Sequence, residues 1–403
     1  MADDRTPPAD EPVTPTTHRT MHRTHRRTVV RVVLVTHLVL ALLTGVGVAV
    51  AYHQLNGNIE ALPAIPEEVD RPDAVEVEGP KQPINILVMG SDTRSGAGNQ
   101  IDGESGAEGS DTTILLHISA DRQDAYGVSL PRDALVDRPE CVMPGGKKVA
   151  GEKLAMFNEA FTVGGPLCTV QMVEKLTDVR IDHQVVVDFN GFKGMVDAVN
   201  GVEVCIPKDV DDDEHDIHFD AGTQTLTGRQ ALNYVRERYV LSVTGDVGRM
   251  KRQQAFIASM INKVVSGGTL SRPDRVYNFL DAATGSLQLD EELANLPALV
   301  DLAMDLRSTG LDDIKFVTVP FAEYEPDPNR LVWTDKADDL WKRIRNDRPL
   351  GREFDGGSVS ASDPVGTPSG TPSQPSTDAP STPEQTERAE AEAEARVQAG
   401  LCA

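Results

Sequence analysis

One apolar segment, residues 29–52, constrains the fold of this chain more than any other feature. Arg31 at its edge, Thr36, His37 and Thr44 are the main polar interruptions. A run of this length is long enough to span a bilayer as a helix. Four arginines precede it, at Arg19, Arg23, Arg26 and Arg27. Because basic residues stay on the cytoplasmic side of a membrane helix, the sequence predicts a single-pass anchor with a cytoplasmic N-terminus.

A cleaved signal peptide is the alternative to an anchor. The tripeptide Ala49-Val50-Ala51 is similar to a signal cleavage site. The apolar run is longer than the usual hydrophobic region of a signal peptide, which favours an uncleaved anchor. Under either interpretation the remainder of the chain lies outside the membrane.

Shifts in composition divide the chain into five predicted segments. Several of them are rich in Pro, Thr, Ser, Gly or acidic residues and have no apolar periodicity, which is typical of linkers and disorder. The segments are a disordered cytoplasmic tail (1–28), the transmembrane helix (29–52), a stalk (53–82), one extracytoplasmic catalytic domain (83–348) and a disordered Ser/Thr/Pro-rich tail (349–403). Within the last tail, the Glu- and Ala-rich residues 384–398 predict a short solvated helix.

Charge and cysteine usage narrow the class of partner and the compartment. The formal net charge of -24 argues against nucleic acid as a partner, because no basic face dominates. The four cysteines have no metal-finger spacing. Cys141 and Cys168 flank one loop-rich segment and could form a disulfide in an oxidising compartment. Cys205 is either buried and free or paired with Cys402.

Strand-like and helix-like runs alternate through the predicted domain. Short apolar runs that end in turn residues predict strands at residues 84–89, 112–118, 125–130, 183–188, 202–206 and 314–319. Longer amphipathic runs predict helices at residues 154–161, 167–176, 190–199, 227–234, 253–265 and 293–306. Such alternation predicts an α/β sandwich, in which helices cover a central sheet.

Arginine is concentrated just before and at the start of one predicted helix. Arg236 and Arg238 are two residues apart, so an extended backbone places both side chains on one face. Three further residues stand at positions i, i+3 and i+4, and a helix places them on one face as well: Arg249, Arg252 and Gln253. The pattern predicts that these side chains gather near one point.

The point where they gather suits a phosphate or a pyrophosphate. Asp246 stands where the N-cap of the helix is expected, so the positive end of the helix dipole lies close by. The planar fork of an arginine matches the oxygens of a phosphate group. A solvated charged helix face is the alternative for a generic arginine run. Few acidic residues are available here to pair such a run, which favours the anion site.

Two aspartates at strand ends predict a metal site. Asp92 follows the first strand directly, and Asp111 opens the next, so the two can come close in space. Two carboxylates together with phosphate oxygens form a natural Mg²⁺ site. Aspartates that cap turns are the alternative, because they are common at such junctions. Arg132 ends a third strand and could point into the same site.

An acidic run at residues 209–216 offers a possible calcium site. Its spacing does not match an EF-hand loop, and a solvated acidic loop is the favoured interpretation.

Taken together, the motifs resemble those of the LytR-CpsA-Psr family of cell-envelope proteins. The resemblance is strong over residues 83–268 and includes the anchor topology. The motifs that carry it, in chain order, are Gly90-Ser91-Asp92, Ser110-Asp111-Thr112, Leu130-Pro131-Arg132-Asp133, Asn158-Glu159-Ala160-Phe161, Asp188-Phe189-Asn190-Gly191-Phe192, Leu226-Thr227-Gly228-Arg229-Gln230-Ala231-Leu232, Tyr234-Val235-Arg236-Glu237-Arg238 and Arg252-Gln253-Gln254.

The resemblance implies a three-layer α/β/α sandwich with a central mixed sheet and a phosphotransferase activity. Such enzymes move a glycopolymer of teichoic acid, capsule or arabinogalactan type from a polyprenyl-diphosphate carrier to a peptidoglycan hydroxyl. The residue composition is also typical of an actinobacterial source. The polymer itself is not encoded in any motif.

The resemblance also implies a role for each site residue. Asp92 and Asp111 would hold Mg²⁺, with Mn²⁺ as the alternative. The side chains implied for the pyrophosphate are Arg132, Arg236, Arg238, Arg249 and Gln253, with Arg252 in support. Asp92, Arg132 and Asp246 are implied in catalysis, Asp246 as a base or as an arginine-orienting group. One departure is Gly109, which stands where the family often has arginine.

Two other functions remain open from the sequence. One is an envelope receptor that binds polyprenyl (pyro)phosphates without transferring them, and the other is a lipid pyrophosphatase. For the lipid tail, an apolar channel is expected among the helices at residues 191–199, 253–265 and 293–306.

Overall fold

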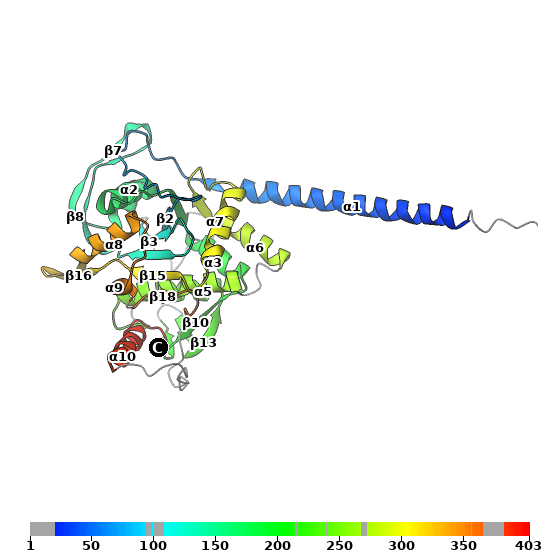
Figure 1. The fold of residues 1–403 in the computed structure, drawn as a ribbon. Helices are drawn as coiled ribbons and strands as arrows, with labels where there is room; N and C mark the ends of the chain where they lie inside the picture. The colour runs from blue at the N-terminus through cyan, green and yellow to red at the C-terminus, as the bar shows by residue number, and fades with distance from the viewer. Residues whose placement is uncertain are drawn as a thin grey trace, which may run out of the picture. The chain divides into compact units, whose positions relative to one another are not determined.

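The computed structural model of the protein describes residues 21–93, 99, 109–213, 217–238, 240–266, 272–355, 357–365 and 383–403 (Figure 1). Contacts divide the chain into two compact units, Met1–Gln54 and Leu55–Ala403. Helix α1 (Met21–Asn58) contains the predicted membrane segment, and the large apolar side chains between Val29 and Tyr52 are exposed. The stretch Arg27–Asn58 is long and apolar enough to cross a membrane. Most of the predicted cytoplasmic tail, residues 1–20, lies outside the described residues.

The second unit is built on an eight-stranded sheet with the strand order β1-β14-β9-β2-β3-β4-β15-β18. Strand β2 pairs with β9 in parallel and with β3 antiparallel, and β4 pairs antiparallel with β3 and parallel with β15. The sheet is therefore mixed, as predicted. The bounds are β1 Glu60–Ala61, β2 Ile84–Ser91, β3 Ser110–Ile118, β4 Ala125–Leu130, β9 His183–Val187, β14 Leu287–Leu289, β15 Ile314–Thr318 and β18 Val359–Ser360.

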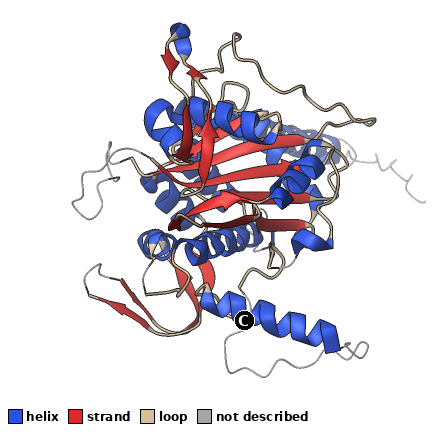
Figure 2. Cartoon of the chain, turned by 90° about the vertical axis from the view of Figure 1, so that its left-hand side faces the viewer, coloured by secondary structure: helices blue, strands red, loops and turns tan. Residues whose placement is uncertain are grey.

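Helices cover both faces of this sheet (Figure 2). Alternate residues of β2 face opposite sides: Leu87 and Met89 join the core beneath α2 and α8, whereas Ile86 joins the core that α7 covers. The predicted three-layer sandwich is confirmed. The helices of this unit are α2 Glu159–Thr177, α3 Phe189–Ala198, α4 Gly228–Arg236, α5 Asp246–Ser266, α6 Pro273–Thr284, α7 Leu296–Thr309, α8 Asp335–Arg345, α9 Arg352–Asp355 and α10 Pro383–Gln398.

The remaining strands of the described chain form two-stranded ladders outside the central sheet. They are β5 (Leu135–Arg138) with β8 (Glu152–Met156), β6 (Cys141–Val142) with β7 (Lys148–Val149), β10 (Val202–Ile206) with β13 (Gly222–Leu226), β11 (Val210–Asp212) with β12 (Ile217–Phe219), and β16 (Phe321–Tyr324) with β17 (Asp327–Trp333). The predicted strand at residues 202–206 is therefore present, but it packs over α3, α4 and α5 rather than in the central sheet.

The helix predicted at residues 154–161 is wrong in its first half. Residues 152–156 form strand β8, in which Met156 pairs with Leu135 and Ala155 with Val136. Ala155 is buried in this arrangement, while Leu154 is exposed with a φ of 52°. Pairing with β5 thus overrides a local sequence of good helix formers. Helix α2 begins only at Glu159 and is interrupted at Gly165, whose φ is 61°.

Part of the predicted stalk belongs to the domain. Strand β1 pairs with β14, and Leu62 and Ile65 pack against the core. Arg71 donates to the buried carboxylate of Glu174 on α2 over 2.7 Å. Residues 60–71 are therefore held by the sheet and by α2, in contrast to the expected stalk.

The predicted disordered tail is also partly built into the domain. Leu350 and Phe354 join the core beneath α8, and β18 pairs with β15. Helix α10 covers the predicted helical residues 384–398, and the residues after it are buried rather than solvated. Two disulfides join Cys141 to Cys168 and Cys205 to Cys402. The second disulfide shows that Cys205 is paired with Cys402 rather than free. Residues 366–382 lie outside the described residues.

Candidate functional site

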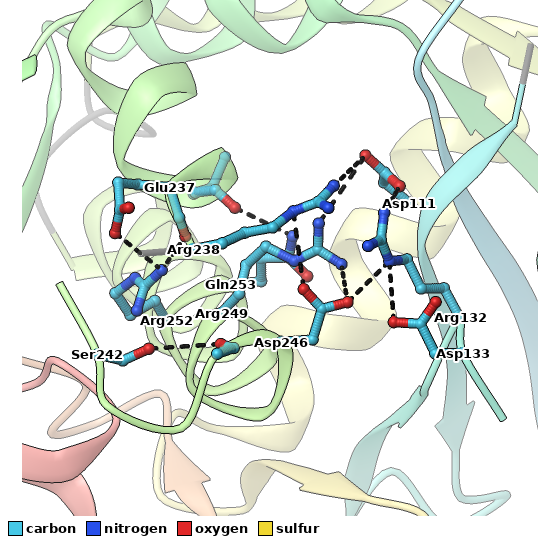
Figure 3. Close-up of polar contacts among 12 residues, drawn as sticks. Asp111, Arg132, Asp133, Glu237, Arg238, Ser242, Asp246, Arg249, Arg252 and Gln253 are labelled. Atoms are coloured by element: carbon cyan, nitrogen blue, oxygen red, sulfur yellow. Dashed lines mark hydrogen bonds and ion pairs between the residues drawn. The ribbon is translucent and has the colours of Figure 1, made fainter. Parts of the chain in front are cut away.

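The predicted site residues come from three neighbouring parts of the sheet and its helices (Figure 3). Asp111 lies at the start of β3, and Arg132 follows β4. Because β3 and β4 are antiparallel, with Thr113 opposite Leu130, the start of one adjoins the end of the other. Helix α5 brings in its first residues, and Arg238 follows the end of α4. We call Asp111, Arg132, Arg238, Asp246 and Arg249 the arginine–aspartate cluster.

The two carboxylates of the cluster bridge its three guanidinium groups. Arg132 donates to Asp111 over 2.5 Å and to Asp246 over 2.8 Å. Arg249 lies 3.1 Å from Asp246 and 3.9 Å from Asp111. Arg238 lies 3.5 Å from Asp111 and 3.7 Å from Asp246. Of the five side chains predicted to gather near one point, Arg238 and Arg249 lie in this cluster, and Arg132 joins them.

Electrostatics in the cluster favour an added anion. Burial alone would raise the pKa of Asp111, but the charges of Arg249, Arg132 and Arg238 outweigh it and hold that pKa below its ordinary value. Arg249 is 1% exposed, and burial together with the neighbouring charge of Arg132 lowers its pKa to about 10. Three guanidinium groups crowd around two carboxylates, so an incoming anion relieves repulsion among the arginines.

A third acidic group, Asp133, lies beside the cluster on the side of β4. Burial and a hydrogen bond to Asp246 raise the pKa of Asp133 to about 6. Burial opposes the shift of Asp246, but the hydrogen bond from Asp133 and the charges of Arg249 and Arg132 lower the pKa of Asp246 to about 2. Such a low pKa makes Asp246 a poor proton acceptor. Its contacts fit the arginine-orienting role rather than the role of a base.

An apolar cavity of about 200 Å³ opens beside the cluster. Its wall is made by the sheet and by helices α3, α4 and α5, and it includes Val88, Ile114, Val187, Phe192, Met195, Leu232, Ile257 and Met260. Asp111, Arg236, Arg249 and Gln253 line its polar part. The expected channel is therefore present between α3 and α5, but α4 rather than α7 contributes the third helix.

Arg236 and Gln253 link the cavity to the helices around it. The guanidinium of Arg236 stacks over the ring of Phe189, 4.8 Å from its centroid. Gln253 donates to the carbonyl of Val235 over 3.1 Å, which ties α5 to α4. Both side chains line the polar part of the cavity.

Arg252 does not join the arginine–aspartate cluster. Its guanidinium points toward Glu237, as Figure 3 shows, and donates to the carbonyl oxygens of Glu237 and Ala399. The side chain is completely buried. The resemblance implied that Arg252 supports the pyrophosphate contacts, and in the structure backbone carbonyls hold its guanidinium outside the cluster.

Asp92 lies at the end of β2 against Gly109. Its backbone N–H donates to the carbonyl of Gly109 over 3.1 Å, and its carboxylate accepts from the Gly109 N–H. Gly109 is two residues before Asp111, so both candidate metal ligands belong to the paired ends of β2 and β3. Their hard carboxylate oxygens fit Mg²⁺ or Mn²⁺, and Asp111 also lines the cavity.

The acidic run contains the one group of three or more close metal-ligand atoms found among the described residues. Asp211, Asp213 and His218 place these atoms within 4.8 Å of one another, and all three residues are exposed. The group lies on the β11–β12 ladder, away from the residues of the cluster, and a solvated acidic loop still explains it.

The sequence patterns missed two functional contacts. Asp133 entered the sequence analysis only as part of the Leu130-Pro131-Arg132-Asp133 motif, although its position directly after Arg132 was the available signal. Phe189 stands within a motif, but no spacing rule indicated that it would carry the guanidinium of Arg236.

Comparison with known proteins identifies the family of this chain. Residues 52–346 match the LytR_cpsA_psr family. The protein belongs to this family.

Two relatives of known name support the same family. The chain is 32% identical over 264 residues to the "cell wall biosynthesis protein LcpA" of Corynebacterium glutamicum, covering 59% of this chain and 49% of that protein. It is 30% identical over 273 residues to the "polyisoprenyl-teichoic acid--peptidoglycan teichoic acid transferase TagU" of Oceanobacillus iheyensis, covering 65% and 77%. The matched part spans about half the length of LcpA.

A solved structure supports the fold. The crystal structure of TagV from B. subtilis superposes with a TM-score of 0.51 at 24% identity, covering 67% of this chain and 99% of that chain.

Proposed function

We propose that this protein is a phosphotransferase that moves a polyprenyl-diphosphate-linked glycopolymer onto peptidoglycan. The observation that carries the proposal is the continuity of the cavity with the arginine–aspartate cluster: Asp111 and Arg249 belong to both. A polyprenyl diphosphate has the same two halves, an apolar tail and an anionic head. The cavity matches the tail, and the arginines match the head.

The arginines also fit the chemistry of transfer. Displacement at a phosphorus atom loads negative charge onto the non-bridging oxygens. Arg132, Arg238 and Arg249 would hold those oxygens with fixed N–H donors in a partly buried site, where such contacts are stronger than in water. Asp246 would keep Arg132 and Arg249 oriented for this contact, because it accepts from both at 2.8 Å and 3.1 Å.

Asp92 and Asp111 would hold Mg²⁺, with Mn²⁺ as the alternative. The ion, when bound, supplies positive charge for the pyrophosphate oxygens. Arg132 and Arg238 already contact the two carboxylate oxygens of Asp111, one oxygen each. An ion held by Asp92 and Asp111 would share these oxygens with both guanidinium groups, so we expect binding of cation and of pyrophosphate to be coupled.

The names of two relatives support the proposed polymer and acceptor, and features of this chain support the proposed membrane topology. TagU is named for transfer of teichoic acid to peptidoglycan, and LcpA for cell wall biosynthesis. Teichoic acid, capsule and arabinogalactan are the candidate polymers. We place the N-terminus in the cytoplasm and the domain outside the membrane, because basic residues precede the apolar helix and two disulfides suit an oxidising compartment.

The test uses the full chain in detergent with a synthetic polyprenyl-diphosphate-linked glycan, peptidoglycan fragments and Mg²⁺. Mass spectrometry should detect the glycan phosphate on peptidoglycan, and Arg132→Ala and Asp111→Ala should form this product about 100-fold or more slowly. Arg272→Ala is the matched control, because Arg272 forms an exposed ion pair with Asp274 on α6. Carrier cleavage without transfer would instead show a lipid pyrophosphatase, and tight binding without turnover would show a receptor.

A further inference from the structure

The residues that follow α10 are bonded into the connection between α4 and α5. This connection comprises residues 237–238 and 240–245 of the described chain and carries Arg238. The backbone N–H of Val243 donates to the carbonyl of Gln398 over 3.1 Å. Leu401 and Cys402 are buried, and Cys402 is joined to Cys205. A segment far away in sequence thus forms part of the wall around the connection.

Close packing leaves this segment little freedom to move. Gly400 has a φ of 80°, and a Cβ atom there would lie 2.5 Å from the carbonyl oxygen of Leu241 and 3.2 Å from Arg252. Only glycine satisfies both the backbone conformation and the close approach. The C-terminal segment is therefore fitted against the α4–α5 connection rather than resting loosely on it.

Arg252 joins the two parts. It donates to the carbonyl of Ala399 over 3.1 Å and to the carbonyl of Glu237. The carboxylate of Glu237 in turn accepts from the N–H groups of Val240 and Leu241, each over 2.8 Å. Removal of the C-terminal segment would take one of these carbonyl partners from a fully buried guanidinium.

We propose that residues 398–402 act as a positioning element for the anion site, holding the α4–α5 connection through Arg252 so that Arg238 faces Asp111 and Asp246. The inference rests on the proposed pyrophosphate-binding role of the cluster. Arg238 comes no closer than 3.5 Å to either carboxylate, whereas Arg132 and Arg249 each lie within 3.1 Å of Asp246. Arg238 also lies next to Glu237, which Arg252 holds. Its position therefore depends most on this support. Arg252 is a positioning residue and does not itself touch the anion.

The test separates the segment from the domain without altering any cluster residue. The double variant Cys205→Ser/Cys402→Ser removes the covalent tether in the full chain, and Gly400→Val displaces the segment sterically. The matched control is Cys141→Ser/Cys168→Ser, which removes the disulfide between β6 and α2. Farnesyl diphosphate is the probe, with affinity measured by calorimetry well below the unfolding temperature. Hydrogen exchange reports on the amides of Val240, Leu241 and Val243.

We expect both C-terminal variants to lose amide protection in the connection and to bind the probe about 10-fold to 100-fold more weakly, as a misplaced contact group would. The control pair should retain both properties. Arg238→Ala combined with the Cys205/Cys402 variant should bind no more weakly than Arg238→Ala alone, because both changes act on the same contact.

Two outcomes would overturn the proposal. One is loss of thermal stability in the C-terminal variants with unchanged probe affinity. The other is a loss of affinity that adds fully to that of Arg238→Ala. A wild-type protein that binds the probe but transfers no glycan would contradict the proposed transferase function and leave this positioning role intact, so the two failures are distinguishable.

Discussion

The guanidinium of Arg132 donates to the carboxylate of Asp111 over 2.5 Å, joining the anion-binding arginines to a candidate metal ligand. The same guanidinium reaches Asp246 on α5, so one side chain connects β3, β4 and α5. Replacement of Arg132 should therefore affect both charge and geometry.

We expect Arg132→Ala to lower kcat/KM for glycan transfer by about 100-fold to 1000-fold, the usual effect of removing one fixed donor from a site of developing charge. Arg132→Lys should restore only part of the rate, because one ammonium group cannot bridge Asp111 and Asp246 as a planar fork does. Initial rates with Arg272→Ala as the control would check this. Full activity of Arg132→Ala would exclude it from the anion site.

The pKa of Asp133 predicts how stability changes with pH. That pKa is raised to about 6 from 3.8, so between these values the folded protein holds a proton that the unfolded chain has released. Stability from this group is present at low pH and falls as pH rises through that window. Asp246, with its pKa lowered to about 2, acts in the opposite sense, and its contribution is lost as pH falls from 3.8 to about 2.

Denaturant unfolding of the wild type and of Asp133→Asn between about pH 4 and about pH 7 measures the first effect. Asn cannot ionise, so the variant should gain stability relative to the wild type as pH rises. A constant difference between the two proteins would show that Asp133 has an ordinary pKa.

The ion pair between Arg71 and Glu174 should contribute to folding. Arg71→Ala would leave the carboxylate of Glu174, which is 2% exposed, without its charged partner. We expect a loss of about 3 kcal/mol in the free energy of unfolding, at the lower end for broken buried pairs because Arg71 is partly exposed. Arg272→Ala should have no measurable effect, since both partners of that pair are exposed. Equal stability of the two variants would show that residues 60–71 are dispensable for the fold.

A substitution in the wall of the apolar cavity should distinguish binding of the lipid tail from binding of the pyrophosphate head. Ile257→Asp places a charge in the cavity wall and should weaken binding of farnesyl diphosphate about 10-fold or more, because apolar area is no longer buried favourably. Binding of inorganic pyrophosphate should be unchanged. Phe256 is a poorer choice, since it is fully buried between Phe192 and Tyr234. Met304→Asp, at a 55% exposed position on α7 outside the cavity wall, is the control for added charge. If the variant lost affinity for both ligands equally, Ile257 would have a structural role rather than a role in binding the lipid tail.

Sequence patterns predicted the parts of the fold with strong periodicity and the parts of the site carried by charge. Strands at 84–89 and 314–319 are short, mainly apolar runs, and Arg132, Arg238 and Arg249 were expected to converge. Helical spacing also placed Arg252 with them, but spacing does not say on which side of a helix a ligand lies. In the structure, the guanidinium of Arg252 donates instead to the backbone carbonyls of Glu237 and Ala399.

The segments missed by sequence analysis are those whose structure depends on distant partners. Residues 60–61 and 359–360 form strands of only two residues, too short for any alternating pattern. Their register is set by β14 and β15, which lie more than a hundred and more than forty residues away, respectively. Asp133 was missed for the same reason, because its partner Asp246 comes from another layer.

These two short strands also determine how the domain can be cut from the full chain. They occupy the two ends of the sheet order, so each covers the open hydrogen-bonding edge of a longer neighbour. A fragment limited to residues 83–348 would uncover the edges of β14 and β15, which are ready templates for pairing with another chain. Aggregation of such a fragment would reflect its exposed edges rather than a defect in its core, and a soluble fragment needs both β1 and β18.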